Sequence, residues 1–186
     1  MKFSSIFFVI TLFILVFSFR YIDQSQHKLS EDSLEIPLVL KGEKVIKHIG
    51  YSLVYSEEHE QAKWVAYVLN KKELSGTFPR SDNFNEDPAV SSGSASNSDY
   101  SKSGYDRGHL APAADMKWSE KAMSESFYYS NMSPQLPAFN RGIWKILEEK
   151  VRDWALENDS ILIVTGPILP SKNEKKLATI GHNSVA

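Results

Sequence analysis

Apolar runs and polar stretches succeed one another in an order that predicts a leader followed by one domain. Residues 3–19 are almost entirely Phe, Ile, Leu and Val, whereas residues 23–35 are polar. Short apolar and aromatic runs then follow at residues 45–49, 51–55 and 63–69 and end in polar residues, which is typical of strands. The first part of the domain is therefore expected to form a sheet, with a buried strand over residues 63–69.

The last third of the chain changes to helical periodicity. Ile143, Leu147, Val151 and Trp154 recur at helical spacing with charged residues on the other faces, and predict an amphipathic helix packed on the sheet. The apolar run at residues 161–164 predicts one more strand. Strands followed by a helix and a strand indicate an α+β fold, with a mainly antiparallel sheet and packed helices.

Residues 1–20 predict a membrane-targeting helix. The apolar run exceeds the roughly 7–15 residues of a cleaved signal peptide, and it is followed by Arg20 and Tyr21 rather than by a small-x-small cleavage site. A signal anchor is therefore favoured over a signal peptide. We expect an amino terminus on the cytoplasmic side, residues 21–35 as a polar tether, and an exported domain. That domain would be membrane-anchored outside the cytoplasm, or secreted or periplasmic if the leader is cleaved.

Composition removes several functional classes. The chain has 186 residues, of which 42% are hydrophobic and 24% are charged, and this suits one globular domain with an appendage. Its formal net charge of -2 provides no global cationic field, so any recognition of phosphate has to be local. The absence of Cys excludes disulfides, thiolate metal sites and a cysteine nucleophile.

Residues 91–104 form a serine-rich segment that precedes the most informative motif. It holds seven Ser and two Gly among fourteen residues, and this predicts a loop at the surface. A gate for substrate is the alternative interpretation of this loop.

The motif Tyr105-Asp-Arg-Gly-His109 supplies a candidate general base. Phosphodiester hydrolysis needs a water activated near neutral pH, and imidazole has the unperturbed pKa that suits this task. His109 follows the charged pair Asp106 and Arg107 and adjoins Gly108, which removes side-chain bulk. The other histidines lack such neighbours and are expected to be structural: His27, His48, His59 and His182.

Asn140 begins the predicted helix and is a candidate metal ligand. Mg²⁺ takes oxygen ligands and keeps most of its waters, so one neutral amide oxygen can hold it while leaving its charge for the phosphate. A helix cap is the alternative role for Asn140, and the two roles are compatible.

Charged residues around these two positions complete the candidate site. Glu148 lies eight residues beyond Asn140, or about 12 Å along a helix, and would reach metal-bound waters rather than the ion. A solvated surface position is its alternative. Arg107 and Arg80 are candidates to pair with phosphate oxygens, and a solvated loop charge is equally consistent with Arg80.

Four segments resemble the signature of the DNA/RNA non-specific endonucleases of the ββα-metal class. They are residues 105–115, 131–135, 140–148 and Thr165-Gly-Pro. The resemblance covers residues 36–186 and implies an endonuclease domain with a ββα-metal active-site core.

The resemblance also implies a role for each residue of the site. His109 would be the general base, and Asn140 the sole protein ligand to Mg²⁺, with Mn²⁺ as the alternative ion. Glu148 and Asn131 would support the hydrated ion and the site. Phosphate oxygens would be contacted by Arg107 and Arg80.

The activity implied is magnesium-dependent cleavage of DNA and RNA without sequence specificity. No segment resembles a base-reading element, and contacts to the backbone carry no sequence information. Family members continue with further strands and a helix beyond this point, so the domain is expected to be incomplete at its C-terminus. Two alternatives stay open: a catalytically inactive, truncated and membrane-tethered binding or remnant protein, and a phosphodiesterase acting on smaller phosphoesters.

Overall fold

The fold described here comes from a computed structural model, which describes residues 36–170, 178–181 and 183–185. The chain divides into two units, Met1–Ile36 and Pro37–Ala186, and all of the helices and strands named below belong to the second. The predicted anchor and tether lie outside the described residues. Among the residues that are described, no helix has the length and apolar character to cross a membrane.

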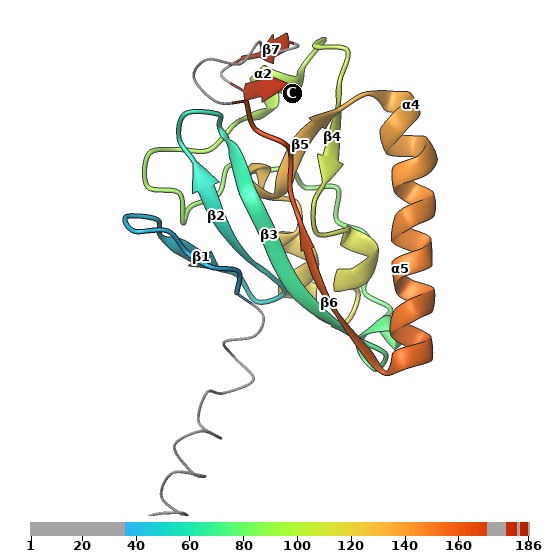
Figure 1. Cartoon of the computed structure of the whole chain (residues 1–186). Helices are drawn as coiled ribbons and strands as arrows, with labels where there is room; N and C mark the ends of the chain where they lie inside the picture. The colour runs from blue at the N-terminus through green and yellow to red at the C-terminus, as the bar shows by residue number, and fades with distance from the viewer. Residues whose placement is uncertain (1–35, 171–177, 182, 186) are drawn as a thin grey trace, which may run out of the picture. The chain divides into compact units, whose positions relative to one another are not determined.

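A four-stranded antiparallel sheet forms the centre of the domain (Figure 1). Its strands, in spatial order, are β1 (Val45–Lys47), β2 (Ser52–Ser56), β3 (Gln61–Asn70) and β6 (Ser160–Thr165). The apolar runs that predicted strands thus form this sheet, and the predicted α+β class with a mainly antiparallel sheet is confirmed.

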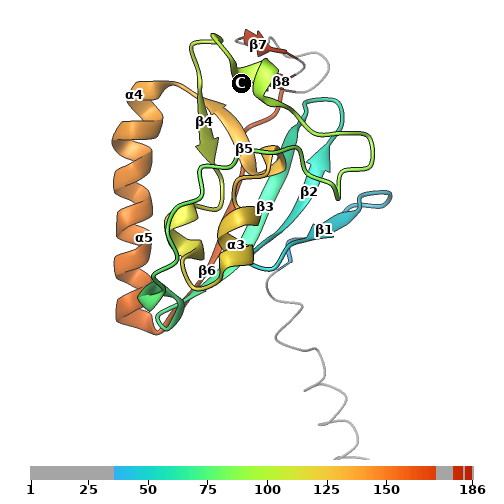
Figure 2. The ribbon, with the colours of Figure 1, turned by 180° about the vertical axis from the view of Figure 1, so that it is seen from behind.

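A second, two-stranded sheet carries the motif residues. β4 (Asp106–His109) pairs with β5 (Met132–Gln135) in antiparallel register. This hairpin and α3 (Glu120–Glu125) lie behind the large sheet in Figure 1 and in front of it in Figure 2, so they cover one of its faces. The connection between β4 and β5 contains α3 and the short helices η3 (Ala113–Met116) and η4 (Tyr129–Asn131).

A long helix follows the hairpin and returns the chain to the large sheet. It consists of α4 (Pro137–Phe139), the π-helical segment η5 (Asn140–Trp144) and α5 (Lys145–Asn158), after which β6 begins. The remaining elements are η2 (Glu73–Ser75), α2 (Asn97–Tyr100), β7 (Ala178–Ile180) and β8 (Asn183–Val185).

The main core lies between the large sheet and this second layer. Leu53, Val65 and Leu69 point into it from the sheet and are at most 1% exposed. Met116 and Ala155 meet them from the helices. Burial of such apolar side chains is the main term that stabilises the domain, and it holds η3, α3 and α5 against the same sheet.

Two predictions about the long helix are wrong. The helical segment begins at Pro137, ahead of Asn140, and is interrupted at Gly142, whose φ of -104° and ψ of -109° are not helical. The apolar face is also misassigned, because α5 packs on the core through Val151 and Ala155. Ile143, Leu147 and Trp154, which were expected to face the sheet, are 62%, 43% and 39% exposed.

The strand β6 is covered on one side only. Ile161 and Ile163 pack against the core, whereas Leu162 and Val164 are 46% and 52% exposed. Within the described part of the chain, β6 pairs with β3 along one edge and with no strand along the other. It is therefore an edge strand with apolar side chains at the surface.

Candidate active site

The strand β4 is placed by close contact with β5. Gly108 lies opposite Ser133 and His109 opposite Met132 in the antiparallel register. A Cβ atom at position 108 would overlap the side chain of Gln135. Glycine at this position leaves room for the side chain of Gln135, which would have to move if residue 108 carried a side chain.

His109 is enclosed by two aromatic rings. Its ring meets that of Phe127 edge to face at 5.0 Å and lies 6.0 Å from that of Phe84, and the residue is 8% exposed. Burial, together with the positive charges of Arg80 and Arg107, lowers the pKa of His109 to about 3, against the opposing charge of Asp82. The imidazole is therefore neutral at neutral pH.

The Nε2 atom of His109 has no hydrogen-bond partner among the described residues, although it is buried. Buried polar atoms are almost always paired, because leaving one unpaired costs about 1–3 kcal/mol. Such an atom calls for an explanation, and a catalytic role is one of the explanations known for it. A neutral imidazole with a free ring nitrogen has the form that a general base requires.

The guanidinium groups of two arginines lie over the faces of the two rings that flank His109. The guanidinium carbon of Arg107 is 3.9 Å from the centroid of Phe84, and that of Arg80 is 4.7 Å from the centroid of Phe127. Stacking of this kind attracts a cation to the face of the ring. The structure thus brings together the predicted base and both predicted phosphate contacts, from segments 80–84, 106–109 and 127.

Asn140 is held by the carboxylate of Asp106. Its Nδ2 donates to Asp106 Oδ2 at 3.0 Å, and Asp106 also accepts two hydrogen bonds from Arg141, at 2.8 and 2.6 Å. The hydrogen bonds from Arg141 and Asn140 keep the pKa of Asp106 below its usual value, against the effect of burial. This arrangement uses the amide nitrogen of Asn140 and turns the other side of the amide, its Oδ1, away from Asp106.

The alternative role of Asn140 as a helix cap is wrong. Its backbone is helical, with φ -58° and ψ -50°, and its N–H donates to the carbonyl of Leu136 at 2.9 Å. A residue in the interior of a helical segment does not cap it. The side chain is therefore available for another task.

The oxygen donors here suit a magnesium ion held largely through water. Asn140 offers one neutral amide oxygen, and in the ranges that the structure covers no three His, Cys, Asp or Glu side chains gather as a metal cage. Mg²⁺ dehydrates reluctantly and is commonly bound by few protein ligands. The residues present therefore fit a hydrated ion better than a fully protein-coordinated one.

Glu148 is half-buried on α5 rather than fully exposed at the surface. Burial, together with the negative charges of Asp115 and Glu149, raises its pKa to about 7, against the opposing charges of Arg152 and Arg80. Arg80 thus acts on both Glu148 and His109. Arg152 fixes this part of α5, because it donates to Asp115 at 2.9 Å and Asp115 accepts from Tyr67 on β3 at 2.8 Å.

Asn131 lies in the core and bonds to the backbone alone. It is 0% exposed, its Oδ1 accepts from the N–H of Ala111 at 2.8 Å, and its Nδ2 donates to the carbonyls of Ala111 and Ser126 at 2.9 and 2.8 Å. These bonds fix the turn that leaves β4 two residues after His109. The contacts therefore give Asn131 a structural task behind the site.

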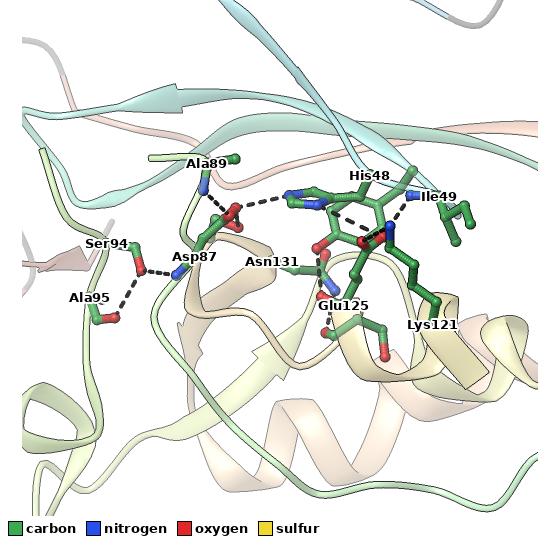
Figure 3. Close-up of polar contacts among 12 residues, drawn as sticks. His48, Ile49, Asp87, Ala89, Ser94, Ala95, Lys121, Glu125 and Asn131 are labelled. Carbon is green, nitrogen blue, oxygen red and sulfur yellow. Dashed lines mark hydrogen bonds and ion pairs between the residues drawn. The ribbon is translucent and has the colours of Figure 1, made fainter. Parts of the chain in front are cut away.

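A second set of polar contacts, around Asp87 and His48, lies next to the segment that contains Asn131 (Figure 3). The sequence did not indicate these contacts. Asp87 accepts from the N–H of Ala89 at 2.8 Å and from Ser130, the neighbour of Asn131, and its Oδ2 is 2.9 Å from Nε2 of His48. The ring of His48 also lies 3.9 Å from Glu125 on its other side. His48 is thus structural, as expected, but its partner is 39 residues away, a distance at which spacing gives no signal.

The structure thus places a His-bearing strand, its antiparallel partner and an Asn-bearing helix on one α+β scaffold. The chain belongs to the DNA/RNA non-specific endonuclease family, whose sequence model matches residues 33–186. The prediction from the motifs is confirmed at this level.

Several proteins of known name are similar to this chain. Endonuclease G, mitochondrial, of Homo sapiens is 38% identical over 144 residues, which are 73% of this chain and 48% of that protein. Nuclease EXOG, mitochondrial, of Xenopus laevis is 37% identical over 155 residues, or 79% and 43% of the two chains. The chain spans about half the length of the curated relatives it matches.

A solved structure shares the fold. The crystal structure of the EndoG/EndoGI complex contains a chain that superimposes with a TM-score of 0.68 at 32% identity. The match covers 76% of this chain and 63% of that one.

Proposed function

We propose that the protein is a magnesium-dependent endonuclease that hydrolyses phosphodiester bonds of DNA and RNA without sequence specificity, with Mn²⁺ as an alternative ion. The observation that carries the proposal is Nε2 of His109, which is buried, neutral and unpartnered among the described residues, beside the guanidinium groups of Arg80 and Arg107. Family membership supports the same reaction.

His109 takes the proton of the attacking water. Its low pKa keeps the imidazole neutral, and the negative charge of a bound phosphate raises that pKa and so strengthens the base. Arg107 and Arg80 pair with phosphate oxygens and hold the scissile group beside Nε2. A positioned base of this kind contributes about 10²–10⁴ in rate.

Asn140 would hold the ion through Oδ1, and Asp106 fixes the orientation of its amide by accepting from Nδ2. When bound, Mg²⁺ would supply positive charge that stabilises the phosphate in the transition state. Glu148 would support the waters around the ion as a hydrogen-bond acceptor. Asn131 maintains the backbone behind His109.

Contacts to the phosphate backbone account for substrate selection. The cationic side chains at the site are arginines, which pair with phosphate oxygens and read no base edge. Because the whole chain carries a formal charge of -2, attraction is confined to this region. We expect affinity to fall with added salt according to the few phosphates that are contacted.

The export and anchoring of the domain stay a proposal that rests on residues 1–20. Membrane fractionation followed by an intact-mass measurement tests it. The full-length mass in the membrane fraction is expected, and a species that begins well beyond Arg20 would overturn the anchor.

Nuclease assays test the proposed activity. Plasmid DNA and single-stranded RNA are incubated with the purified protein in Mg²⁺, in Mn²⁺ and in EDTA, with His109→Ala prepared in parallel to exclude a contaminating nuclease. Degradation of both substrates at many sites, lost in EDTA and in the variant, is expected. Binding without cleavage would indicate the inactive alternative, and hydrolysis of only a small phosphodiester such as bis(p-nitrophenyl) phosphate would indicate the other.

A further inference from the structure

Arg107 is held by two residues that the motif does not contain. Its guanidinium carbon lies 3.9 Å from the centroid of the Phe84 ring, and its Nη1 donates to Oδ1 of Asn97 at 3.3 Å. The ring holds the guanidinium group over its face, and the hydrogen bond to Asn97 restrains it from a second direction. Arg107 is therefore positioned from the loop around Phe84 and from α2.

Asn97 is itself anchored to the core. Its Oδ1 also accepts from the hydroxyl of Tyr129 at 3.3 Å, and Tyr129 is 1% exposed and stacks on Tyr100 at 5.6 Å. The side chain of Asp99 accepts from the N–H of Ser96 at 2.7 Å and closes the turn of α2. The serine-rich segment is thus tied to the site at Asn97.

Phe84 connects Arg107 with the base. The same ring that lies under Arg107 is 6.0 Å from the ring of His109 and meets Phe127 edge to face at 5.0 Å. A change in the position of Phe84 would therefore move the cation relative to the imidazole.

We propose that Phe84 and Asn97 are positioning residues that orient Arg107 for a phosphate oxygen of the substrate. This inference rests on the proposed function, because it assigns Arg107 to the phosphate. A long side chain that is already ordered loses less conformational freedom when it binds, so its orientation increases affinity for the substrate. The serine-rich segment then belongs to the substrate-binding apparatus.

Three substitutions separate the aromatic face, the hydrogen bond and simple packing. Phe84→Leu keeps an apolar side chain but removes the ring, Phe84→Tyr keeps the ring, and Asn97→Ala removes the acceptor. Asn83→Ala is the matched control, because Asn83 is exposed and adjoins Phe84 in the same loop. Thermal melts establish that each variant is folded at the assay temperature.

Steady-state cleavage and equilibrium binding of a labelled oligonucleotide in EDTA are then measured. We expect Phe84→Leu and Asn97→Ala to raise KM and Kd by about 3–10-fold, while Phe84→Tyr and the control match the wild type. Asn97→Ala should change kcat less than about 2-fold, whereas Phe84→Leu should also lower kcat, because the Phe84 ring lies near that of His109. In an Arg107→Ala background, neither change should raise KM or Kd further. A purely structural role would give equal losses in both backgrounds.

The failure of this inference differs from that of the proposed function. Unchanged KM and Kd in Phe84→Leu and Asn97→Ala, together with a large increase in Arg107→Ala, would overturn the positioning role alone. Unchanged values in Arg107→Ala would remove Arg107 from phosphate binding and overturn both. Equal effects of Asn97→Ala with and without Arg107 would also overturn the positioning role.

Discussion

The two sides of the candidate site are held in very different ways. On the hairpin side, formed by β4, β5 and the short helix η4 that precedes β5, His109 and Asn131 are 8% and 0% exposed and are enclosed by the core. On the helix side, formed by α4, η5 and α5, Asn140 is half-buried and its segment carries the exposed side chains of Phe139 and Ile143.

Few polar contacts join the two sides. Asp106 accepts from Asn140 and Arg141, and the indole N–H of Trp144 donates to the carbonyl of His109 at 3.2 Å. The hairpin side is thus fixed by packing and the helix side by a small number of hydrogen bonds. Substitutions of supporting residues should therefore cost stability on the hairpin side and mainly activity on the helix side.

His109 is expected to be an exception on the hairpin side, because it is buried and yet is the proposed general base, so its substitution should cost mainly activity. His109→Ala should lower kcat by about 10²–10⁴-fold, since it removes the base, and leave binding of nucleic acid in EDTA largely intact. Steady-state cleavage and oligonucleotide binding measure the two effects. His48→Ala is the matched control: it should lower the melting temperature while the folded protein keeps its activity. Wild-type cleavage by a folded His109→Ala variant would refute the mechanism.

Asn131 provides the clearest test of the hairpin side. Asn131→Ala leaves the N–H and carbonyl of Ala111 and the carbonyl of Ser126 without their partner, and at about 1–3 kcal/mol for each buried group the free energy of unfolding should fall by at least about 3 kcal/mol. Urea denaturation measures the loss. Asn158→Ala, at an exposed position near the end of α5, is the control and should stay within about 0.5 kcal/mol. A stable but inactive Asn131→Ala protein would contradict the structural role.

Substitutions of Asn140 test the helix side, where we expect a loss of activity that exceeds any loss of stability. Asn140→Asp replaces the neutral ligand with a charged one, and Asn140→Ser shortens the ligand, so both should reduce magnesium-dependent cleavage by at least about 10-fold. Asn140→Ser should change the melting temperature little, because Asn140 does not cap the helix, whereas Asn140→Asp also sets a second carboxylate against that of Asp106 and should lower the melting temperature. Isothermal titration with Mg²⁺ gives a reading that does not depend on turnover. Activity that falls only in proportion to stability would remove Asn140 from the metal site.

Glu148 should show the smallest effect, as a dependence of stability on pH. Its folded pKa of about 7 lies above the usual value of 4.5, so the folded state binds more protons between these values and stability falls as pH rises through that range. Glu148→Gln cannot ionise. It should therefore melt about 2–4 °C above the wild type at pH 8, with a smaller difference at pH 4. A constant difference at all pH values would show that ionisation of Glu148 does not affect stability.

The sequence predicted the parts of the site that depend on short-range spacing. His109 and Arg107 are neighbours in one strand, and the strands of the large sheet follow their apolar runs. The orientation of the long helix was not predictable in this way, because periodicity identifies an apolar face without specifying what covers it. Ile143 and Trp154 continue the pattern of Val151 but lie outside the contact with the sheet.

The contacts that position the site were also beyond prediction, because they join distant segments. Asp87 meets His48 across 39 residues, and Asp106 meets Asn140 across 34. Asn97 looked like one polar residue in a serine-rich loop, yet it bonds to Arg107. Such pairs depend on the register of the strands and on the packing of the connecting segments. Local composition determines neither of these.

The exposed edge of β6 has a consequence for the colloidal behaviour of the protein. A strand edge without a partner is a template for pairing between molecules, and the apolar side chains of Leu162 and Val164 favour such contacts. The apparent molar mass measured by light scattering should therefore increase with protein concentration even while the site stays folded. A charged residue on this surface, as in Val164→Lys, acts as a gatekeeper against aggregation and should extend the concentration range in which the protein remains monodisperse.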